Sequence, residues 1–250
     1  MIAAHTLRYA AKLAIHDNPR RPPMTQPKPT HRIRSFIRRQ GRLTPGQQHA
    51  LDNLWHSYGL DPTVNYDFND VFGRDADLIM EIGFGNGESL LAMAIANPAL
   101  NYIGIEVHQP GVGHLLLKLH ELNVSNVRIY NHDAIEILEQ RMADNSLSGV
   151  QLFFPDPWHK VRHHKRRIVN ESFVNLLRQK LKDDGYFHAA TDWQNYAEHM
   201  LVVLSAAAHF SNTSLNADYC ERPDYRPLTK FENRGLRLGH GVWDLIFRKQ

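Results

Sequence analysis

The chain has 250 residues, of which 29 are Lys or Arg, 26 are Asp or Glu, 16 are His and one, Cys220, is cysteine. This length fits one α/β domain with a short appendage and is too short for two large domains. A single cysteine excludes an internal disulfide framework and fits a reducing compartment, so we expect a cytoplasmic protein. Its longest mainly apolar run, residues 201–208, is far below the roughly 18 residues of a membrane span, so we expect no membrane partner.

The formal net charge of +3 hides an uneven distribution along the chain. Residues 1–60 carry ten Lys or Arg and two acids, a net of +8, so the remainder carries +3 minus +8, or −5. The position of the charges, rather than their sum, therefore bears on the partner.

The first 30 residues have no clear fold. Residues 18–30 contain five prolines, which prevent a continuous helix or strand. Residues 1–16 could form an amphipathic helix that faintly resembles a transit peptide, or the first 23 residues could come from an upstream start with Met24 as the natural one. We predict a disordered or non-native tail over residues 1–30, a basic arm over 31–74 and a catalytic domain over 75–250.

From about residue 75, short apolar runs alternate with amphipathic segments, which is typical of repeated βα units in an α/β fold. The predicted strands are 77–82, 101–106, 126–131, 150–154, 185–190 and 242–247. The predicted helices are 87–96, 110–122, 135–142, 170–181 and 193–208. Residues 147–149 and 183–185 are predicted turns between helix and strand.

A glycine-rich turn follows the first of these strands. Gly83, Gly85 and Gly87 would let the backbone approach a ligand beyond the carboxyl end of the sheet. The dinucleotide pattern G-x-G-x-x-G is not met, because Glu88 stands where the third glycine belongs. A diphosphate would meet that carboxylate, whereas Glu81, just before the turn, suits a cationic ligand.

Acids at the next two strand ends extend this pattern. Glu106 can accept hydrogen bonds from both ribose hydroxyls, and Asp133 can accept one from an adenine amino group. S-adenosyl-L-methionine carries an ammonium and a sulfonium and has no phosphate. The three acids therefore favour a site for this methyl donor over a site for NAD.

The fourth strand leads into Asp156, which lies between Pro155 and Pro157. Both prolines restrict the backbone, so the carboxylate is fixed at the mouth of the same pocket, as a catalytic or donor-binding group would be. Trp158 could stack on a base or pack as an anchor, and the sequence leaves both alternatives open.

A basic segment follows at once and contains no acid. Its density of positive charge suits a phosphate backbone, although a solvated loop is the simpler alternative. The candidate RNA-contact residues are Lys160, Arg162, His163, His164, Lys165, Arg166 and Arg167.

Two further segments complete the predicted site. Asp192 follows the fifth strand and could contact substrate or cap the next helix. A polar loop over residues 226–241 precedes the last strand, and a loop of this length is usually functional. No histidine pair combines i,i+4 spacing with the helical acid of the H-E-x-x-H pattern, so we expect no metal requirement.

Several motifs together closely resemble the bacterial tRNA (guanine-N7-)-methyltransferase family. They are E-I-G-F-G-N-G-E at 81–88, G-I-E-V-H at 104–108, F-F-P-D-P-W-H-K at 153–160, and T-K-F-E with the later G-H-G-V-W-D. The resemblance covers about residues 31–249. It implies a Rossmann-like class I methyltransferase fold with a mainly parallel seven-stranded sheet, an antiparallel last strand and helices on both faces.

The resemblance also implies roles for residues and a substrate, a guanine in the variable loop of tRNA. Glu81, Glu106 and Asp133 look like donor ligands, and Asp156 looks like an active-site acid that borders the donor. The implied substrate-binding residues are Lys160, Asp192, Thr229, Lys230, Phe231 and Glu232, with residues 162–167 as an RNA-contact segment.

Guanine N7 has an in-plane lone pair and no proton, so the sequence predicts a site that aligns the reactants and stabilises charge, with Asp156 orienting the guanine. The alternatives are a donor-dependent methyltransferase acting on another RNA, a small molecule or a protein, and an RNA-binding module with a vestigial pocket. We expect a monomer or weak homodimer.

Overall fold

The computed structural model describes residues 33–37, 41–229, 232 and 241–250. Ile33–Gln250 form one compact unit. The tail predicted over residues 1–30 lies outside the described residues.

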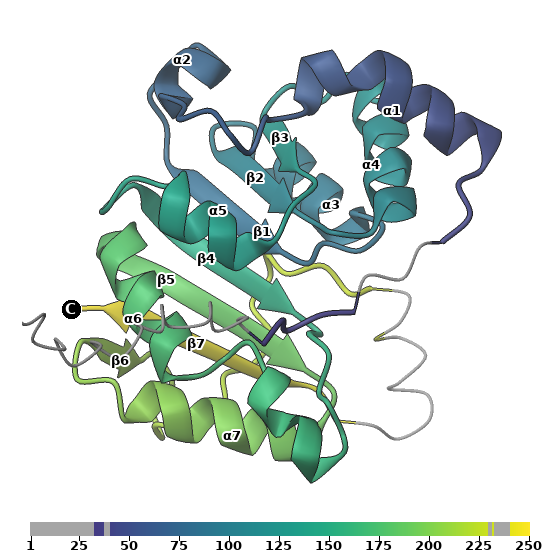
Figure 1. Ribbon diagram of the computed structural model, residues 1–250. Coiled ribbons are helices and arrows are strands. Elements are labelled where there is room, and N and C mark those ends of the chain that lie inside the picture. Colours follow the sequence, from purple (N-terminus) through teal and green to yellow (C-terminus); the bar gives the residue numbers. More distant parts are fainter. Residues whose placement is uncertain (1–32, 38–40, 230–231, 233–240) are drawn as a thin grey trace, which may run out of the picture. The chain divides into compact units, whose positions relative to one another are not determined.

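A seven-stranded sheet forms the centre of the described chain (Figure 1), in the order β3-β2-β1-β4-β5-β7-β6. All neighbouring pairs among β1 to β5 are parallel, and β7 is antiparallel to both β5 and β6. In Figure 1 the arrows of β4 and β5 accordingly point to the right, and the arrow of β7 points to the left. The strands are β1 (Leu78–Ile82), β2 (Asn101–Ile105), β3 (Val127–Tyr130), β4 (Leu147–Phe153), β5 (Leu181–Thr191), β6 (Phe210–Asn212) and β7 (Trp243–Lys249).

Helices cover both faces of this sheet, because successive residues of each strand point to opposite sides. In β1, Met80 and Ile82 pack with α5, α6 and α7, while Ile79 packs with α1, α3 and α4. The helices are α1 (Pro45–Tyr58), α2 (Phe68–Phe72), α3 (Glu88–Ala96), α4 (Gln109–Glu121), α5 (Ala134–Gln140), α6 (Glu171–Lys180) and α7 (Gln194–Ser205), with the 3-10 helix η1 (Val161–Arg166).

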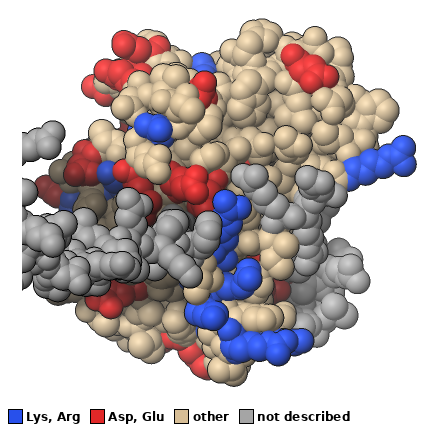
Figure 2. All heavy atoms as spheres, viewed as in Figure 1, with Lys and Arg blue, Asp and Glu red and all other residues tan. Residues whose placement is uncertain are grey.

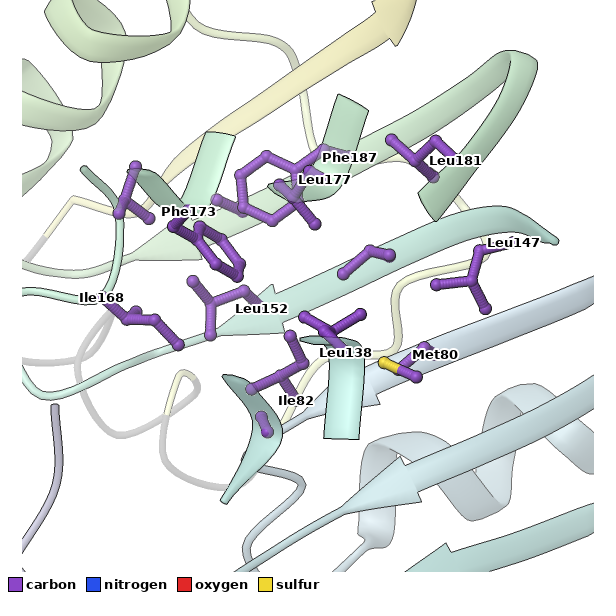
Figure 3. Close-up of a cluster of buried hydrophobic side chains, with 14 of the residues drawn as sticks. Met80, Ile82, Leu138, Leu147, Leu152, Ile168, Phe173, Leu177, Leu181 and Phe187 are labelled. Carbon is purple, nitrogen blue, oxygen red and sulfur yellow. The ribbon is translucent and has the colours of Figure 1, made fainter. Parts of the chain in front are cut away.

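The larger hydrophobic cluster lies between the sheet and α5 to α7 (Figure 3). Phe173 and Leu177 of α6 pack against Phe187 of β5 and Leu152 of β4, and all four side chains are at most 3% exposed. The rings of Phe173 and Phe187 meet edge to face with 5.7 Å between centroids. This packing fixes β4 and β5, whose carboxyl ends carry the predicted active-site loop and Asp192.

The mainly parallel sheet, its antiparallel last strand and the helices on both faces confirm the predicted fold class. Both predicted turns were wrong. Residues 147–149 belong to β4 and residues 183–185 belong to β5, and the pairing of these two strands shifts register between Leu147 and Gly149. The helices α1 and α2, the 3-10 helix η1 and the strand β6 were missed.

Helix α1 lies in the stretch predicted as a basic arm. Thr44 Oγ1 accepts a hydrogen bond from Gln47 N (3.2 Å), and Gln47 Oε1 accepts one from Thr44 N (2.9 Å), so a capping box starts the helix. Its Ala50 is fully buried with residues of α4. This part of the arm therefore packs on the sheet domain. None of the helices in the described ranges is long and apolar enough to cross a membrane.

Candidate active site

The strand order reverses between β1 and β4, where both neighbours of β1 run parallel to it. Open α/β sheets bind ligands at such a switch point, beyond the carboxyl ends of the strands. The predicted donor residues and the predicted catalytic residue follow the strands on both sides of this point.

The turn between β1 and α3 depends on glycine. Gly83, Gly85 and Gly87 have φ of +73°, +59° and +78°, a region that other residues rarely adopt. A Cβ at Gly83 or Gly85 would meet nothing within 4 Å, so the turn leaves open space beside its backbone. At Gly87 a Cβ would lie 2.7 Å from Leu115 Cδ1, so this glycine allows the turn to pack closely on α4.

Glu106 follows β2 and fixes the glycine turn from the neighbouring strand. Its Oε2 accepts a hydrogen bond from Gly85 N (2.9 Å), and its Oε1 accepts from Val107 N (2.6 Å) and His108 N (2.8 Å). A carboxylate has about four acceptor positions. One position therefore remains for a ligand hydroxyl, whereas the sequence predicted that Glu106 accepts from both ribose hydroxyls.

Glu81 lies inside β1 with its side chain 2% exposed. Its Oε2 has no hydrogen-bond partner in the part of the chain that the structure describes. Burial, and then the neighbouring Glu106 carboxylate, raise the pKa of Glu81 to about 8. Because an unpaired buried acceptor is costly, this group suits a ligand that donates hydrogen bonds or carries positive charge.

A cavity of about 260 Å³ opens at this edge of the sheet. Glu106, Asp133, Asp156 and Gly83 line it, so three of the four predicted acids are brought together. Glu81, Gly85 and Gly87 are not on its wall; Glu81 lies directly before the lining residues Ile82 and Gly83. The other lining residues are Ser35, Phe36, Ile105, Val107, His132, Ala134, Leu152, Phe153, Phe154, Pro155 and Ile168.

Asp133 and Asp156 differ in their surroundings. Asp133 is 4% exposed, and its Oδ1 accepts a hydrogen bond from Ile135 N (2.9 Å), which caps α5. Asp156 is exposed at the rim of the cavity. Asp133 is thus oriented by its helix, whereas Asp156 is open to solvent.

Trp158 packs within the loop after β4. Its Nε1 donates a hydrogen bond to the Ser35 carbonyl (3.1 Å), and the Arg166 guanidinium lies 4.8 Å from its ring centroid. Of the two alternatives that the sequence left open, the structure favours packing. The indole joins residues 33–37 to the basic segment.

The basic segment forms a positive surface beside the cavity. Lys160, Arg162 and Lys165 are exposed, and His163, His164 and Arg166 are half-buried. Desolvation, and then the surrounding cations, lower the pKa of His163. Figure 2 shows Lys and Arg side chains gathered over the segment that joins β4 to α6. An anion such as a phosphate would relieve this crowding of positive charge.

Arg167 departs from its predicted role as an RNA contact. It is 3% exposed, its Nε donates to the Pro157 carbonyl (3.0 Å), and its Nη2 donates to Asn195 Oδ1 (2.8 Å). Its guanidinium also lies 4.7 Å from the Tyr196 ring centroid. Arg167 therefore holds the active-site loop on α7 and is not accessible to a phosphate.

Glu232 is likewise turned inward, although a substrate contact was predicted. It is 3% exposed and forms two hydrogen bonds with Arg226, Nη1 to Oε2 (2.7 Å) and Nη2 to Oε1 (2.8 Å). Thr229 Oγ1 accepts a hydrogen bond from Glu232 N (3.1 Å). Lys230 and Phe231 lie outside the described residues. Asp192 is half-buried, and the N-cap of α7 is Trp193, so the capping alternative for Asp192 does not hold.

Arg226 is the centre of a buried charged cluster that sequence reasoning missed. Besides Glu232, its Nε and Nη2 bind the two oxygens of Asp244 at 2.7 and 2.9 Å. Asp244 also contacts His188 Nε2 (2.7 Å), whose Nδ1 is 2.9 Å from the Tyr225 hydroxyl. The only sequence signals were a charged residue in the long loop and an acid in a predicted strand. Ser35 and Phe36, on the cavity wall, gave no signal. Within the described ranges, no group of His, Cys, Asp and Glu could hold a metal ion.

Solved structures share this fold. The 16S rRNA methyltransferase KamB superposes with a TM-score of 0.56 at 12% identity, covering 75% of this chain and 95% of that chain. A mutant 16S rRNA (adenine(1408)-N(1))-methyltransferase from Catenulisporales acidiphilia, crystallised with cosubstrate SAM, gives 0.52 at 15% identity, covering 76% and 92%. Residues 75–245 match the family described as "Putative methyltransferase". The fold is that of a Rossmann-like methyltransferase.

Relatives with more similar sequences identify the family within this class. The tRNA (guanine-N(7)-)-methyltransferase of Shewanella halifaxensis is 60% identical over 219 residues, which are 87% of this chain and 92% of that protein. The enzyme of the same name from Yersinia enterocolitica is 60% identical over 221 residues, 88% and 92% of the two chains. The chain belongs to the tRNA (guanine-N7-)-methyltransferase family.

Proposed function

We propose that this chain transfers a methyl group from S-adenosyl-L-methionine to N7 of a guanine in the variable loop of tRNA. The proposal is supported mainly by the acid-lined cavity at the switch point of the sheet, which lies directly beside an exposed basic segment. The names of relatives that are 60% identical support the substrate. The single cysteine supports a cytoplasmic location, and we propose a monomer or weak homodimer.

The residues present fit the methyl donor. Glu81 Oε2 is a buried acceptor without a partner in the described chain, Glu106 retains one acceptor position, and the turn leaves space at Gly83 and Gly85. Glu106 would hold the ribose, and Asp133 would hold the adenine amino group. When bound, S-adenosyl-L-methionine supplies an electrophilic methyl group on a sulfonium.

NAD fits less well. Glu88 is the exposed first residue of α3, where a dinucleotide would place its diphosphate. A carboxylate at that position repels phosphate.

Gly111 of α4 packs closely against the glycine turn between β1 and α3. A Cβ at this position would lie 2.1 Å from the Gly85 carbonyl oxygen, which is backbone and cannot rotate away. We expect Gly111→Ala to displace the turn and weaken donor binding at least tenfold by calorimetry. The control Gly46→Ala, whose Cβ would make an ordinary 3.8 Å contact with Leu117, should bind the donor like the wild type. Equal affinity of both variants would contradict this role.

Asp156 is the exposed acid among the residues that line the cavity, which supports a role for it in orienting the guanine. N7 needs no base to become a nucleophile, so Asp156 would orient the ring and stabilise the positive charge that develops on it. We expect Asp156→Asn to lower kcat by about 10- to 100-fold with tRNA affinity little changed. Single-turnover methylation with saturating donor and tRNA measures the rate of the methyl-transfer step itself. Near wild-type turnover would show that the carboxylate has no such role.

Methyl transfer from labelled donor to an unmodified tRNA transcript, followed by mapping of the methylated nucleotide, tests the proposed function. We expect one labelled guanine in the variable loop. Label on another RNA or on a small molecule would favour the alternative methyltransferases. Donor binding without any transfer would favour an RNA-binding module.

A further inference from the structure

Trp193 presents an aromatic surface beside the candidate active site. Its side chain is 40% exposed. Strand β5 ends at Thr191, and Asp192 and Trp193 follow it. The backbone of Trp193 is held firmly, because its N–H donates to Thr191 Oγ1 (3.2 Å) and its carbonyl accepts from Tyr196 N (2.9 Å) and Ala197 N (3.0 Å). The exposed ring thus extends from a rigid strand end.

The ring lies next to the active-site loop. His159 contacts it edge to face, with 4.1 Å between ring centroids and an interplanar angle of 72°. His159 is exposed, precedes Lys160 of the basic segment, and follows Asp156 by three positions. Trp193 therefore lies where the active-site loop meets the basic segment, and it is not one of the residues that line the cavity.

The neighbouring tryptophan cannot serve the same purpose. Trp158 already donates its N–H to Ser35, and Arg166 and His163 contact its ring. A base stacks on an exposed aromatic face, and such faces next to cationic grooves bind unpaired nucleotides. Because N7 is inaccessible inside an RNA helix, the target guanine must lie outside a regular helix when it reaches the active site.

We propose that Trp193, together with His159, stacks on an unpaired base of the tRNA substrate. This inference rests on the proposed function and adds a substrate-binding residue to it. Positive charge from the basic segment holds the backbone, and the indole holds a base, so the two features bind one strand.

The test compares Trp193→Ala, Trp193→Phe and the matched control Val202→Ala, an exposed apolar residue (70%) of α7. Since stacking on an aromatic side chain is worth about 5- to 100-fold in binding, we expect Trp193→Ala to raise the tRNA Kd and KM by about that factor with kcat little changed. Trp193→Phe should recover most of the loss, and Val202→Ala should behave like the wild type. Donor affinity should be equal in all four proteins.

A Trp193→Ala variant with wild-type Kd and KM for tRNA would overturn the inference, as would an equal loss in Trp193→Phe or Val202→Ala. Failure of the proposed function would look different, because the wild type itself would then transfer no methyl group to tRNA. In that case a weaker tRNA Kd of Trp193→Ala would still support the stacking role.

Discussion

Replacing Arg226 by methionine should lower the free energy of unfolding by about 3–5 kcal/mol, the largest stability effect that we expect from one substitution. Arg226 is 1% exposed and is the guanidinium shared by Glu232 and Asp244, both of which are buried. Methionine fills a similar volume but leaves two carboxylates without their cation. Removing one partner of a buried ion pair is far more costly than replacing the whole pair by apolar groups.

The pH dependence of the free energy of unfolding, measured in urea, is a second test of this prediction. Burial alone would raise the pKa of Asp244, but hydrogen bonds from His188 and Arg226 lower it overall. A lowered pKa stabilises the fold above the ordinary carboxyl pKa, and this contribution disappears as pH falls through the folded-state value. The loss caused by Arg226→Met should therefore be largest above the ordinary carboxyl pKa of 3.8 and should shrink as pH falls below it.

Arg248 provides the matched control, because it is an exposed arginine of β7 that donates a hydrogen bond to the Asp184 carbonyl (2.8 Å). We expect Arg248→Met to change stability by less than about 1 kcal/mol. If Arg226→Met were as mild as Arg248→Met, the buried ion pairs of Arg226 with Glu232 and Asp244 would not stabilise the fold.

Glu81→Gln should strengthen the fold and weaken the donor site. The pKa of Glu81 is raised to about 8, so between the ordinary value of 4.5 and 8 the folded protein holds a proton that the unfolded chain has lost. Stability then falls as pH rises through this window, and an uncharged glutamine removes the loss. We expect the free energy of unfolding of Glu81→Gln to exceed that of the wild type by about 2–4 kcal/mol at pH 7.5, and by little at pH 4.5.

The same substitution should weaken donor binding about 100-fold at pH 7.5, since the neutral amide cannot pair with a cation. Wild-type affinity should rise between pH 6 and 7.5, because the carboxylate form becomes populated, by up to about tenfold per pH unit. Affinity of Glu81→Gln should stay flat over that range. Calorimetry with S-adenosyl-L-methionine measures both curves, and parallel curves would show that Glu81 does not face the donor's charge.

The sequence predicted the strands and the acids at their ends, because these features depend on local pattern. The runs before Gly83 and Glu106 are mainly apolar, as buried parallel strands are, and acids at strand ends had to meet at one edge of the sheet. For that reason Glu106, Asp133 and Asp156 were expected around one cavity, and the structure brings them there. A capping-box signal, Thr44 with Gln47, was present but was overlooked within a segment judged by its charge.

The sequence could not show which charged residues turn inward. Arg167 and Glu232 belong to motifs full of polar residues, and only the tertiary structure places one on α7 and the other against Arg226. The contact of Ser35 with Trp158 joins residues 123 positions apart and carries no pattern in either segment. Strand β6 has only three residues, too few for a periodicity to appear.

Replacement of the target guanine by 7-deazaguanine tests whether N7 accepts the methyl group. Two transcripts that differ only in this atom at the mapped position keep the same fold and the same phosphates, so binding should be preserved. We predict label on the guanine transcript and none on the 7-deazaguanine transcript at equal tRNA occupancy. Equal labelling of both transcripts would show that N7 is not the methyl acceptor.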